Sequence, residues 1–210
     1  MTLIRSAKLL AIVRFRDPGD VLGALEALAG GGIELLEVTI DTPGALEAVE
    51  RATRAGRRVG VGTVVTSDQV RRCADAGAPF VVSPGLVRDV VDTAHMLGME
   101  AVPGVLTPTE LLHAEAAGAD AVKLFPASLG GPAYIRALRG PFPNTAILPT
   151  GGIRIDEVAS YLEAGATCVG LGSQLVGHTP PRTREDFDRI AARTASAVDA
   201  AGGRPDEHPS

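Results

Sequence analysis

Short apolar runs recur along the chain at intervals of about 20–25 residues, the length of one strand, one helix and two short loops. Eight such runs cover residues 9–14, 35–40, 58–64, 80–85, 100–105, 121–126, 146–152 and 168–173. They are rich in Val and nearly continuous in apolar character, which is typical of parallel strands that helices cover. The pattern therefore predicts eight strands.

The segments between these runs predict helices. Apolar residues recur at i, i+3, i+4 and i+7 in residues 21–29, 45–55, 67–76 and 109–117. We expect Asp20, Ser67 and Thr109 to cap first turns. We expect a left-handed glycine to end most of the helices, at Gly30, Gly56, Gly77, Gly98, Gly118 and Gly165.

The order of these elements predicts an α/β fold. Eight strand–helix units favour a single (β/α)₈ TIM barrel as one domain over residues 1–201, with a doubly wound sheet as the alternative. Residues 184–201 predict one further helix, and residues 202–210 predict a disordered tail.

Composition excludes several classes of partner. The formal net charge is −5, aromatic residues make up 3% and Trp is absent, so neither nucleic acid nor a membrane is expected as a partner. Cys73 and Cys168 form no CxxC motif, and the four histidines are scattered. We therefore expect reduced thiols, no metal, no cofactor and a cytoplasmic location.

One lysine stands out chemically. The chain has only two lysines, Lys8 and Lys123, among 20 cationic residues, and Lys123 lies within the apolar run 121–126. An amine can lose its proton and attack a ketone, whereas a guanidinium cannot. Lys123 is thus a candidate Schiff-base nucleophile, and a structural, ion-paired lysine is the other interpretation.

A glutamate occupies a similar place in the second run. Side chains alternate along a strand, so Glu37 shares a face with Leu35 and Thr39, as Lys123 does with Ala121 and Phe125. If both faces point inward, the acid and the amine meet near the C-terminal strand ends, where barrel active sites form. Glu37 could then transfer protons, or simply neutralise Lys123.

Two glycine motifs follow the last two strands. They are PTGGI (149–153) and GLGS (170–173), at the positions where barrels of this kind often bind phosphate through backbone N–H groups. Tight turns without a ligand are the alternative interpretation.

Polar residues also close other predicted strands. Thr63 lies at the end of the third run, Ser83, Pro84 and Gly85 at the end of the fourth, and Thr150 at the end of the seventh. Arg14 closes the first and could hold a carboxylate, although a surface arginine would look the same in sequence.

Taken together, these residues resemble the 2-keto-3-deoxy-6-phosphogluconate (KDPG) aldolase and 4-hydroxy-2-oxoglutarate aldolase family. The resemblance covers roughly residues 8–177 and rests on LLEVTI, VGVGTV, VSPG, VPGV, VKLFPAS, PTGGI and GLGS, in family order. It implies a class I lyase that cleaves KDPG to pyruvate and glyceraldehyde 3-phosphate, and 4-hydroxy-2-oxoglutarate to pyruvate and glyoxylate. It also implies a homotrimer.

The resemblance assigns roles to particular residues. Lys123 matches the Schiff-base lysine and Glu37 the proton-transferring glutamate. The positions that match pyruvate contacts are Thr63, Pro84 and Phe125. Those that match the phosphate contacts are Gly151, Gly152 and Ser173, and Gly172 belongs to the same motif.

One position departs from the family pattern. Many members carry an arginine four residues after the glutamate, where it holds the substrate carboxylate, and this chain has Asp41. We expect Arg14 to supply the missing charge. Relatives without that arginine include galactonate-series aldolases, so 2-keto-3-deoxy-6-phosphogalactonate is the alternative substrate. A thiamine-phosphate synthase-like barrel and a non-catalytic metabolite-binding barrel are more distant alternatives, and neither requires Lys123.

Overall fold

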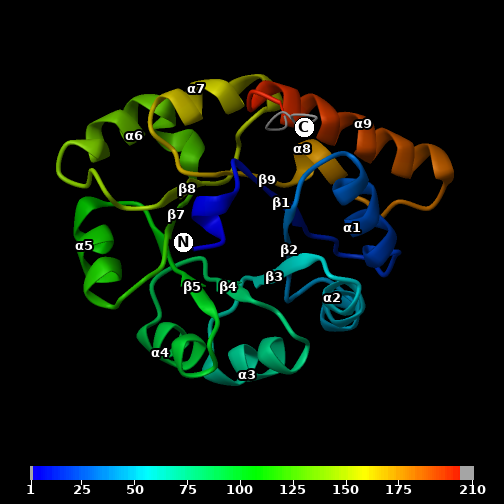
Figure 1. Ribbon diagram of the computed structural model, residues 1–210, viewed down its shortest axis with the longest axis horizontal. Coiled ribbons are helices and arrows are strands. Elements are labelled where there is room, and N and C mark those ends of the chain that lie inside the picture. Colours follow the sequence, from blue (N-terminus) through cyan, green and yellow to red (C-terminus); the bar gives the residue numbers. More distant parts are fainter. Residues whose placement is uncertain (1, 204–210) are drawn as a thin grey trace, which may run out of the picture.

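A computed structural model describes residues 2–203 of the 210. It has the predicted α/β class, with parallel strands inside and helices around them (Figure 1). The predicted tail lies outside the described residues, apart from Gly202 and Gly203, which follow the last helix with positive φ.

The strands form two parallel sheets. A curled sheet of six has the order β5-β4-β3-β2-β1-β9, and a second sheet has the order β6-β7-β8. The six strands are β5 Glu100–Val102, β4 Phe80–Val82, β3 Arg58–Gly62, β2 Leu35–Thr39, β1 Leu9–Val13 and β9 Val169–Leu171. The other three are β6 Gly104–Val105, β7 Val122–Leu124 and β8 Ile147–Pro149.

Each predicted run contains a strand, but the run at 100–105 contains two. Pro103 separates β5 from β6, because proline has no N–H to donate to a ladder. Its carbonyl still accepts a 2.9 Å hydrogen bond from the Lys123 N–H. On the other side, Thr150 forms a bridge with Gly170, and the Thr167 N–H donates to the Ile147 carbonyl at 2.9 Å. Backbone hydrogen bonds thus join the two sheets at both edges.

The helices lie outside the strands (Figure 1). They are α1 Val21–Gly30, α2 Ala45–Arg54, α3 Ser67–Asp75, α4 Arg88–Met96, α5 Pro108–Ala116, α6 Gly131–Arg139, α7 Val158–Glu163, α8 Ser173–Val176 and α9 Arg184–Ala200. Three short 3₁₀ turns, η1 Ile4–Ser6, η2 Ala127–Leu129 and η3 Ile155–Glu157, complete the elements of the described chain.

Helix ends follow the predicted chemistry with three corrections. Asp20 caps α1 by accepting from the Gly23 N–H, but the hydroxyls that cap α3 and α5 belong to Thr66 and Thr107 rather than to Ser67 and Thr109. Each lies one or two residues upstream, where its side chain can reach the third helical N–H.

The third correction concerns a helix C-terminus. Gly30 is still helical, and the left-handed residue after α1 is Gly32, with φ 106°. Three consecutive glycines made that position ambiguous in the sequence.

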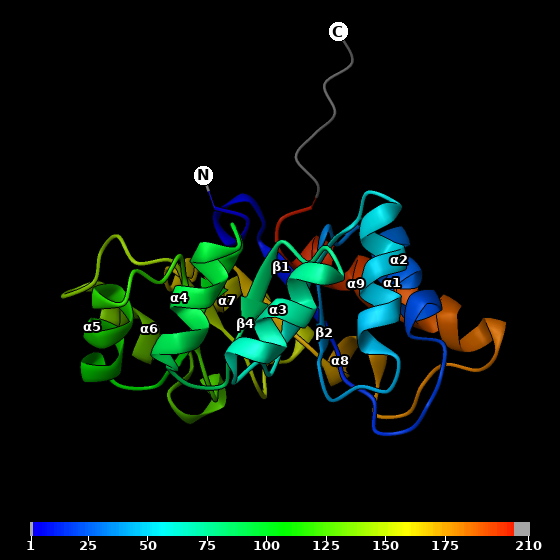
Figure 2. The same ribbon diagram turned by 90° about the horizontal axis from the view of Figure 1, so that it is seen from below.

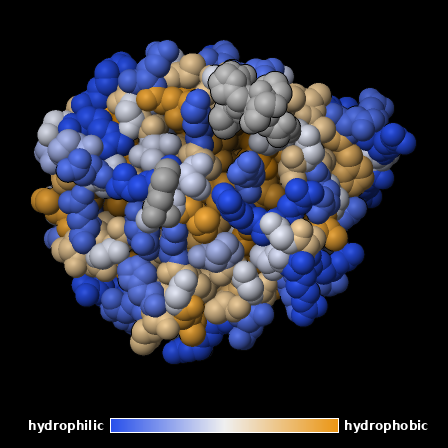
Figure 3. Space-filling view, viewed as in Figure 1, coloured by the Kyte–Doolittle hydropathy of each residue, from blue (hydrophilic) through white to orange (hydrophobic). Residues whose placement is uncertain are grey.

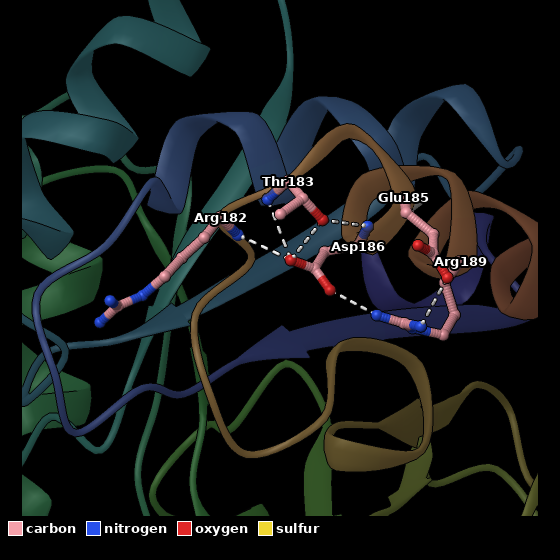
Figure 4. A network of polar contacts seen from close by, with 5 residues as sticks. All are labelled: Arg182, Thr183, Glu185, Asp186 and Arg189. Atoms are coloured by element: carbon pink, nitrogen blue, oxygen red, sulfur yellow. Dashed lines mark hydrogen bonds and ion pairs between the residues drawn. The ribbon is translucent and has the colours of Figure 1, made fainter.

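The N-terminus of α9 is fixed by a polar network (Figure 4). The Thr183 hydroxyl accepts from the Asp186 N–H, and the Asp186 carboxylate accepts from the Thr183 N–H at 2.9 Å. Arg189 pairs with Asp186 and Glu185. The hydrogen bonds lower the pKa of the Asp186 carboxyl to about 2, so this cap stays ionised far below neutral pH.

The inner face of the strands is closed at its N-terminal end. Ile4 of η1 is fully buried and belongs to an inner apolar cluster with Leu10, Leu35, Phe80 and Ala121. Figure 2 shows η1 on one side of the molecule, and α8 with the loop after β1 on the other. On the side viewed in Figures 1 and 3, hydrophilic and apolar residues are interspersed. The C-terminal strand ends, with the predicted site residues, lie on the opposite side.

Cys73 and Cys168 are both buried and free. Burial raises the pKa of the Cys73 thiol to about 12 and shifts that of Cys168 in the same direction. Burial thus keeps both thiols protonated and away from solvent. No helix among residues 2–203 is both long enough and apolar enough to span a membrane.

Candidate active site

Lys123 and Glu37 both point to the inner face. Lys123 lies in β7 with 7% of its surface exposed, and Glu37 lies in β2 with 1% exposed. Their strand neighbours Ala121 and Leu35, two residues away in each case, belong to the inner apolar cluster. The strand alternation read from the sequence therefore gave both directions correctly, and the two residues come from different sheets.

The carboxyl group of Glu37 has no hydrogen-bond partner. Both of its oxygens are buried and unpaired among the described residues. Burial raises the pKa of Glu37, and the nearby charges of Lys123 and Arg14 act in the opposite direction to a smaller extent. A buried acid left without partners is costly to a fold, and such groups cluster at functional sites.

The amine of Lys123 is also available. Its Nζ lies 5.4 Å from the centroid of the Phe125 ring, and no ion pair or hydrogen bond joins this amine to another residue within 2–203. Lys8, by contrast, donates to the Ala201 carbonyl at 2.9 Å. Of the two lysines, Lys123 alone is buried beside an acid, which is the arrangement that an amine nucleophile needs.

Arg14 reaches across the ends of three adjacent strands. It follows β1, and its guanidinium donates to the Thr63 hydroxyl after β3 and to the Thr39 hydroxyl at the end of β2, the latter at 3.4 Å. Its Nε lies 3.9 Å from the Asp41 carboxylate. Arg14 is thus not a free surface arginine, because two hydroxyls accept from its guanidinium. It is also not reserved for a substrate carboxylate, because Asp41 competes for the same guanidinium.

Thr63 has an unusual backbone. Its φ is 63°, and it is the one non-glycine residue with positive φ in the described part of the chain. A β-branched residue is strained there, at a cost of about 1–3 kcal/mol, and such strain concentrates at functional sites. This conformation places its hydroxyl against Arg14.

The loop after β4 lies close to β6. A Cβ on Gly104 would come within 2.8 Å of the Gly85 nitrogen and would overlap the Pro84 carbonyl. The glycine of VPGV therefore makes room for the backbone of VSPG. Pro84 itself is exposed at the strand ends.

The predicted phosphate motifs lie side by side. Thr150 is 6% exposed and contacts Gly170 at the base of the two loops. Gly151 and Gly152 both have positive φ. A Cβ at Gly151 would lie 2.8 Å from the Phe125 ring, and one at Gly152 would lie 2.7 Å from Cβ of Ser128. Glycine is thus required at both positions, because φ is positive there and because Phe125 and Ser128 leave no space for a Cβ.

Backbone N–H groups are free in these loops. Among residues 2–203, those of Gly151, Gly152 and Ser173 donate to no other backbone group. Gly172 and Ser173 come directly after β9, at the start of α8. The arrangement provides several donors for an oxyanion.

Sequence reasoning missed three contributors to this site. Gly62 gives Glu37 its space, Thr39 contacts Arg14, and Ser128 packs beside Gly152. A glycine inside a strand is a signal of close approach that could have identified Gly62. Thr39 and Ser128 gave no distinct signal, because hydroxyl residues at strand and turn ends are common.

The two cavities found in the described chain lie away from these residues. Two cavities of about 530 and 480 Å³ have no predicted site residue in their walls. No group of three or more His, Cys, Asp or Glu side chains within residues 2–203 could hold a metal ion.

Comparison with known proteins gives the family. The family model described as KDPG and KHG aldolase matches residues 1–193. A probable 2-dehydro-3-deoxy-6-phosphogalactonate aldolase of Rhizobium meliloti is 38% identical over 93% of each chain. A 2-dehydro-3-deoxy-phosphogluconate aldolase of Pseudomonas aeruginosa is 37% identical over 80% of this chain and 79% of its own.

Solved structures agree. The KDPG aldolase of Legionella pneumophila, with pyruvate captured as a covalent carbinolamine intermediate, has a TM-score of 0.81 and 32% identity, and covers 92% of this chain and 96% of its own. A native KDPGal structure has a TM-score of 0.82 and 30% identity over 91% and 93%. A thiamine phosphate pyrophosphorylase of Pyrococcus furiosus shares the fold alone, with a TM-score of 0.74 at 16% identity. The resemblance read from the sequence is therefore confirmed: the chain is an enzyme of aldolase type and belongs to the KDPG and KHG aldolase family.

Proposed function

We propose that this enzyme cleaves KDPG to pyruvate and glyceraldehyde 3-phosphate through a Schiff base on Lys123. The observation that carries this proposal is the buried amine of Lys123 on the same inner face as the unpaired acid Glu37. The carbinolamine captured in the Legionella relative supports the same chemistry.

The reaction follows from these two groups. The neutral amine of Lys123 attacks C2 of the keto acid, and loss of water gives a protonated imine, with Glu37 moving the protons. The imine accepts the electron pair of the C3–C4 bond as the C4 hydroxyl gives up its proton and the aldehyde leaves. The resulting enamine takes a proton at C3, and hydrolysis then releases pyruvate and regenerates the amine.

The substrate ends are held by the surrounding residues. Arg14 and Thr63 bind the substrate carboxylate. Pro84 and Phe125 pack against the pyruvate unit of the substrate, and Thr150 lies beside the substrate's carbon chain. The phosphate takes hydrogen bonds from Gly151, Gly152, Gly172 and Ser173. The free N–H groups in the loops after β8 and β9 support this assignment.

Two structural proposals accompany this function. The backbone hydrogen bonds that join the sheets at both edges support one closed (β/α)₈ barrel, in which β5 and β6 count as one strand interrupted by Pro103. The family resemblance implies a homotrimer, and exposed apolar side chains are available for its interfaces, with Leu129 71%, Leu112 56% and Met96 75% exposed. Light scattering after gel filtration tests the trimer, and a monomer mass would refute it.

Borohydride added with pyruvate tests the Schiff base. We expect a reduced pyruvate adduct on Lys123 and none on Lys8, located by peptide mass spectrometry. Lys123→Arg keeps the charge but not the nucleophile, so it should abolish trapping and nearly all turnover. An unmodified protein, or turnover that EDTA removes and Mg²⁺ restores, would contradict the proposal.

A substrate panel tests the epimer. Relatives of both the gluconate and galactonate series match this chain. Pyruvate release from both C4 epimers, with and without phosphate, identifies the preferred substrate. Faster release from the galactonate epimer would replace KDPG with the alternative in this proposal.

A further inference from the structure

Arg14 contacts two kinds of acceptor. On one side, the Thr39 hydroxyl accepts from Nε at 3.4 Å, and the Thr63 hydroxyl accepts from the guanidinium. On the other side, the Asp41 carboxylate lies 3.9 Å from the same Nε. One donor thus faces both a neutral hydroxyl and a competing charge.

The threonine hydroxyls on one side of Arg14 are buried, whereas the Asp41 carboxylate on the other side is exposed. Thr39 and Thr42 are 1% and 3% exposed, and their hydroxyls lie 3.0 Å apart. The Phe15 N–H donates to the Thr42 hydroxyl at 3.3 Å, so Thr42 is itself fixed by the backbone next to Arg14. The side chain of Asp41 is 57% exposed, and an exposed ion pair at that separation contributes little.

Hydrogen bonds connect the Phe15 backbone, Thr42, Thr39 and Arg14 in series. The Phe15 N–H takes one lone pair of the Thr42 hydroxyl, and either hydroxyl can be the donor in the contact between Thr42 and Thr39. In either direction Thr39 keeps a lone pair that accepts from Arg14. Thr39 also shares the inner face with Glu37, and the charge of Arg14 acts on the Glu37 carboxyl. The pair thus holds Arg14 on the side where Glu37 and Lys123 lie.

We propose that the buried Thr39–Thr42 hydroxyl pair is the positioning element that holds Arg14 ready for the substrate carboxylate, against the pull of Asp41. This proposal rests on the proposed function of Arg14. Thr39 and Thr42 touch no reacting atom, and their effect reaches the substrate only through the guanidinium.

Pyruvate binding measures the effect without the full aldol substrate. The probe is pyruvate with borohydride, and the readouts are the half-saturating pyruvate concentration and the maximal trapping rate. Thr39→Val keeps the shape and removes the hydroxyl. We expect it to raise the half-saturating concentration about three- to tenfold, as expected for one lost hydrogen bond, with the maximal rate changed less than about twofold.

Matched variants separate positioning from a packing defect. Thr39→Ser keeps the acceptor and should restore binding to within about twofold of wild type. Thr194→Val makes the same change at another fully buried threonine, whose hydroxyl donates to the Ile190 carbonyl far along the chain in α9, and should leave pyruvate binding unchanged. Adding Asp41→Asn to Thr39→Val removes the competing negative charge and should recover part of the lost affinity.

The outcomes are distinguishable. If Arg14→Ala weakens pyruvate binding but Thr39→Val does not, the positioning proposal is wrong while the function of Arg14 stands. If Thr39→Val and Thr39→Ser weaken binding equally, the effect is one of packing and the proposal fails. If Arg14→Ala itself has no effect, the carboxylate is held elsewhere, and the proposed function of Arg14 fails first.

Discussion

Gly62 makes room for the carboxylate of Glu37. A Cβ at Gly62 would lie 2.6 Å from Cδ of Glu37 and closer still to Oε1. The two residues belong to neighbouring strands, β3 and β2, and are two residues out of register, since Gly62 pairs with Thr39 and Glu37 with Gly60. The position of the buried acid thus depends on the absence of a side chain on the next strand.

Gly62→Ala should therefore displace Glu37 while leaving Lys123 in place. A displacement of about 1 Å in a catalytic group can cost roughly 100-fold in rate, and we expect a loss of that order in kcat for pyruvate release. Gly30→Ala is the control, because a Cβ there would meet nothing within 4 Å. Unchanged kcat in Gly62→Ala would contradict the proton-transfer role of Glu37.

Glu37 should also make stability depend on pH. Burial raises its pKa in the folded state, so between the unfolded and folded values the folded protein binds more protons. The free energy of unfolding then falls as pH rises through that window. Glu37→Gln should remove this loss and melt higher than wild type at neutral pH, by about 2–4 °C for each kcal/mol recovered. Thermal melts of both proteins from pH 4 upward measure this difference. If the melting temperatures of the two proteins depend on pH in the same way, the pKa of Glu37 is not raised in the folded state.

Removing the guanidinium of Arg14 should weaken substrate binding. A hydrogen bond to a charged group contributes about 1.5–3 kcal/mol, or roughly 10- to 150-fold in affinity. We expect Arg14→Ala to raise KM by a factor in that range, and steady-state kinetics with KDPG measures it. Arg16→Ala, which changes an exposed arginine two residues later, is the matched control. Normal KM in Arg14→Ala would place the carboxylate at backbone N–H groups near Thr63.

Thr63→Gly should separate stability from binding. Glycine adopts φ 63° without strain, which offsets its own entropic cost of about 0.5–1 kcal/mol. We expect a melting temperature equal to or above that of wild type, together with weaker pyruvate binding because Arg14 loses its hydroxyl partner. A clear drop in melting temperature would show that the Thr63 side chain stabilises the fold rather than the site.

The sequence predicted most of the strands and helices because apolar periodicity is a local property of the chain. Lys123 and Glu37 were recognisable because charged residues inside apolar runs are rare. The break at Pro103 and the left-handed Gly32 depended on single backbone positions, which periodicity does not resolve. The contacts of Arg14 with Thr39, Thr63 and Asp41 could not be predicted, since they join three strand ends that are distant in sequence.

The buried Ile4 at the N-terminal end of the strands has a kinetic consequence. Because η1 and the inner apolar cluster fill that end, we expect substrate to enter and products to leave at the other end of the strands, beside the loops after β8 and β9. In the proposed reaction the three-carbon pyruvate unit, bonded to Lys123 through C2, then lies deepest, and the phosphorylated aldehyde lies toward the opening. The aldehyde must therefore depart before pyruvate, so release is ordered. In the reverse direction pyruvate binds first, and an aldehyde that arrives early blocks its own co-substrate.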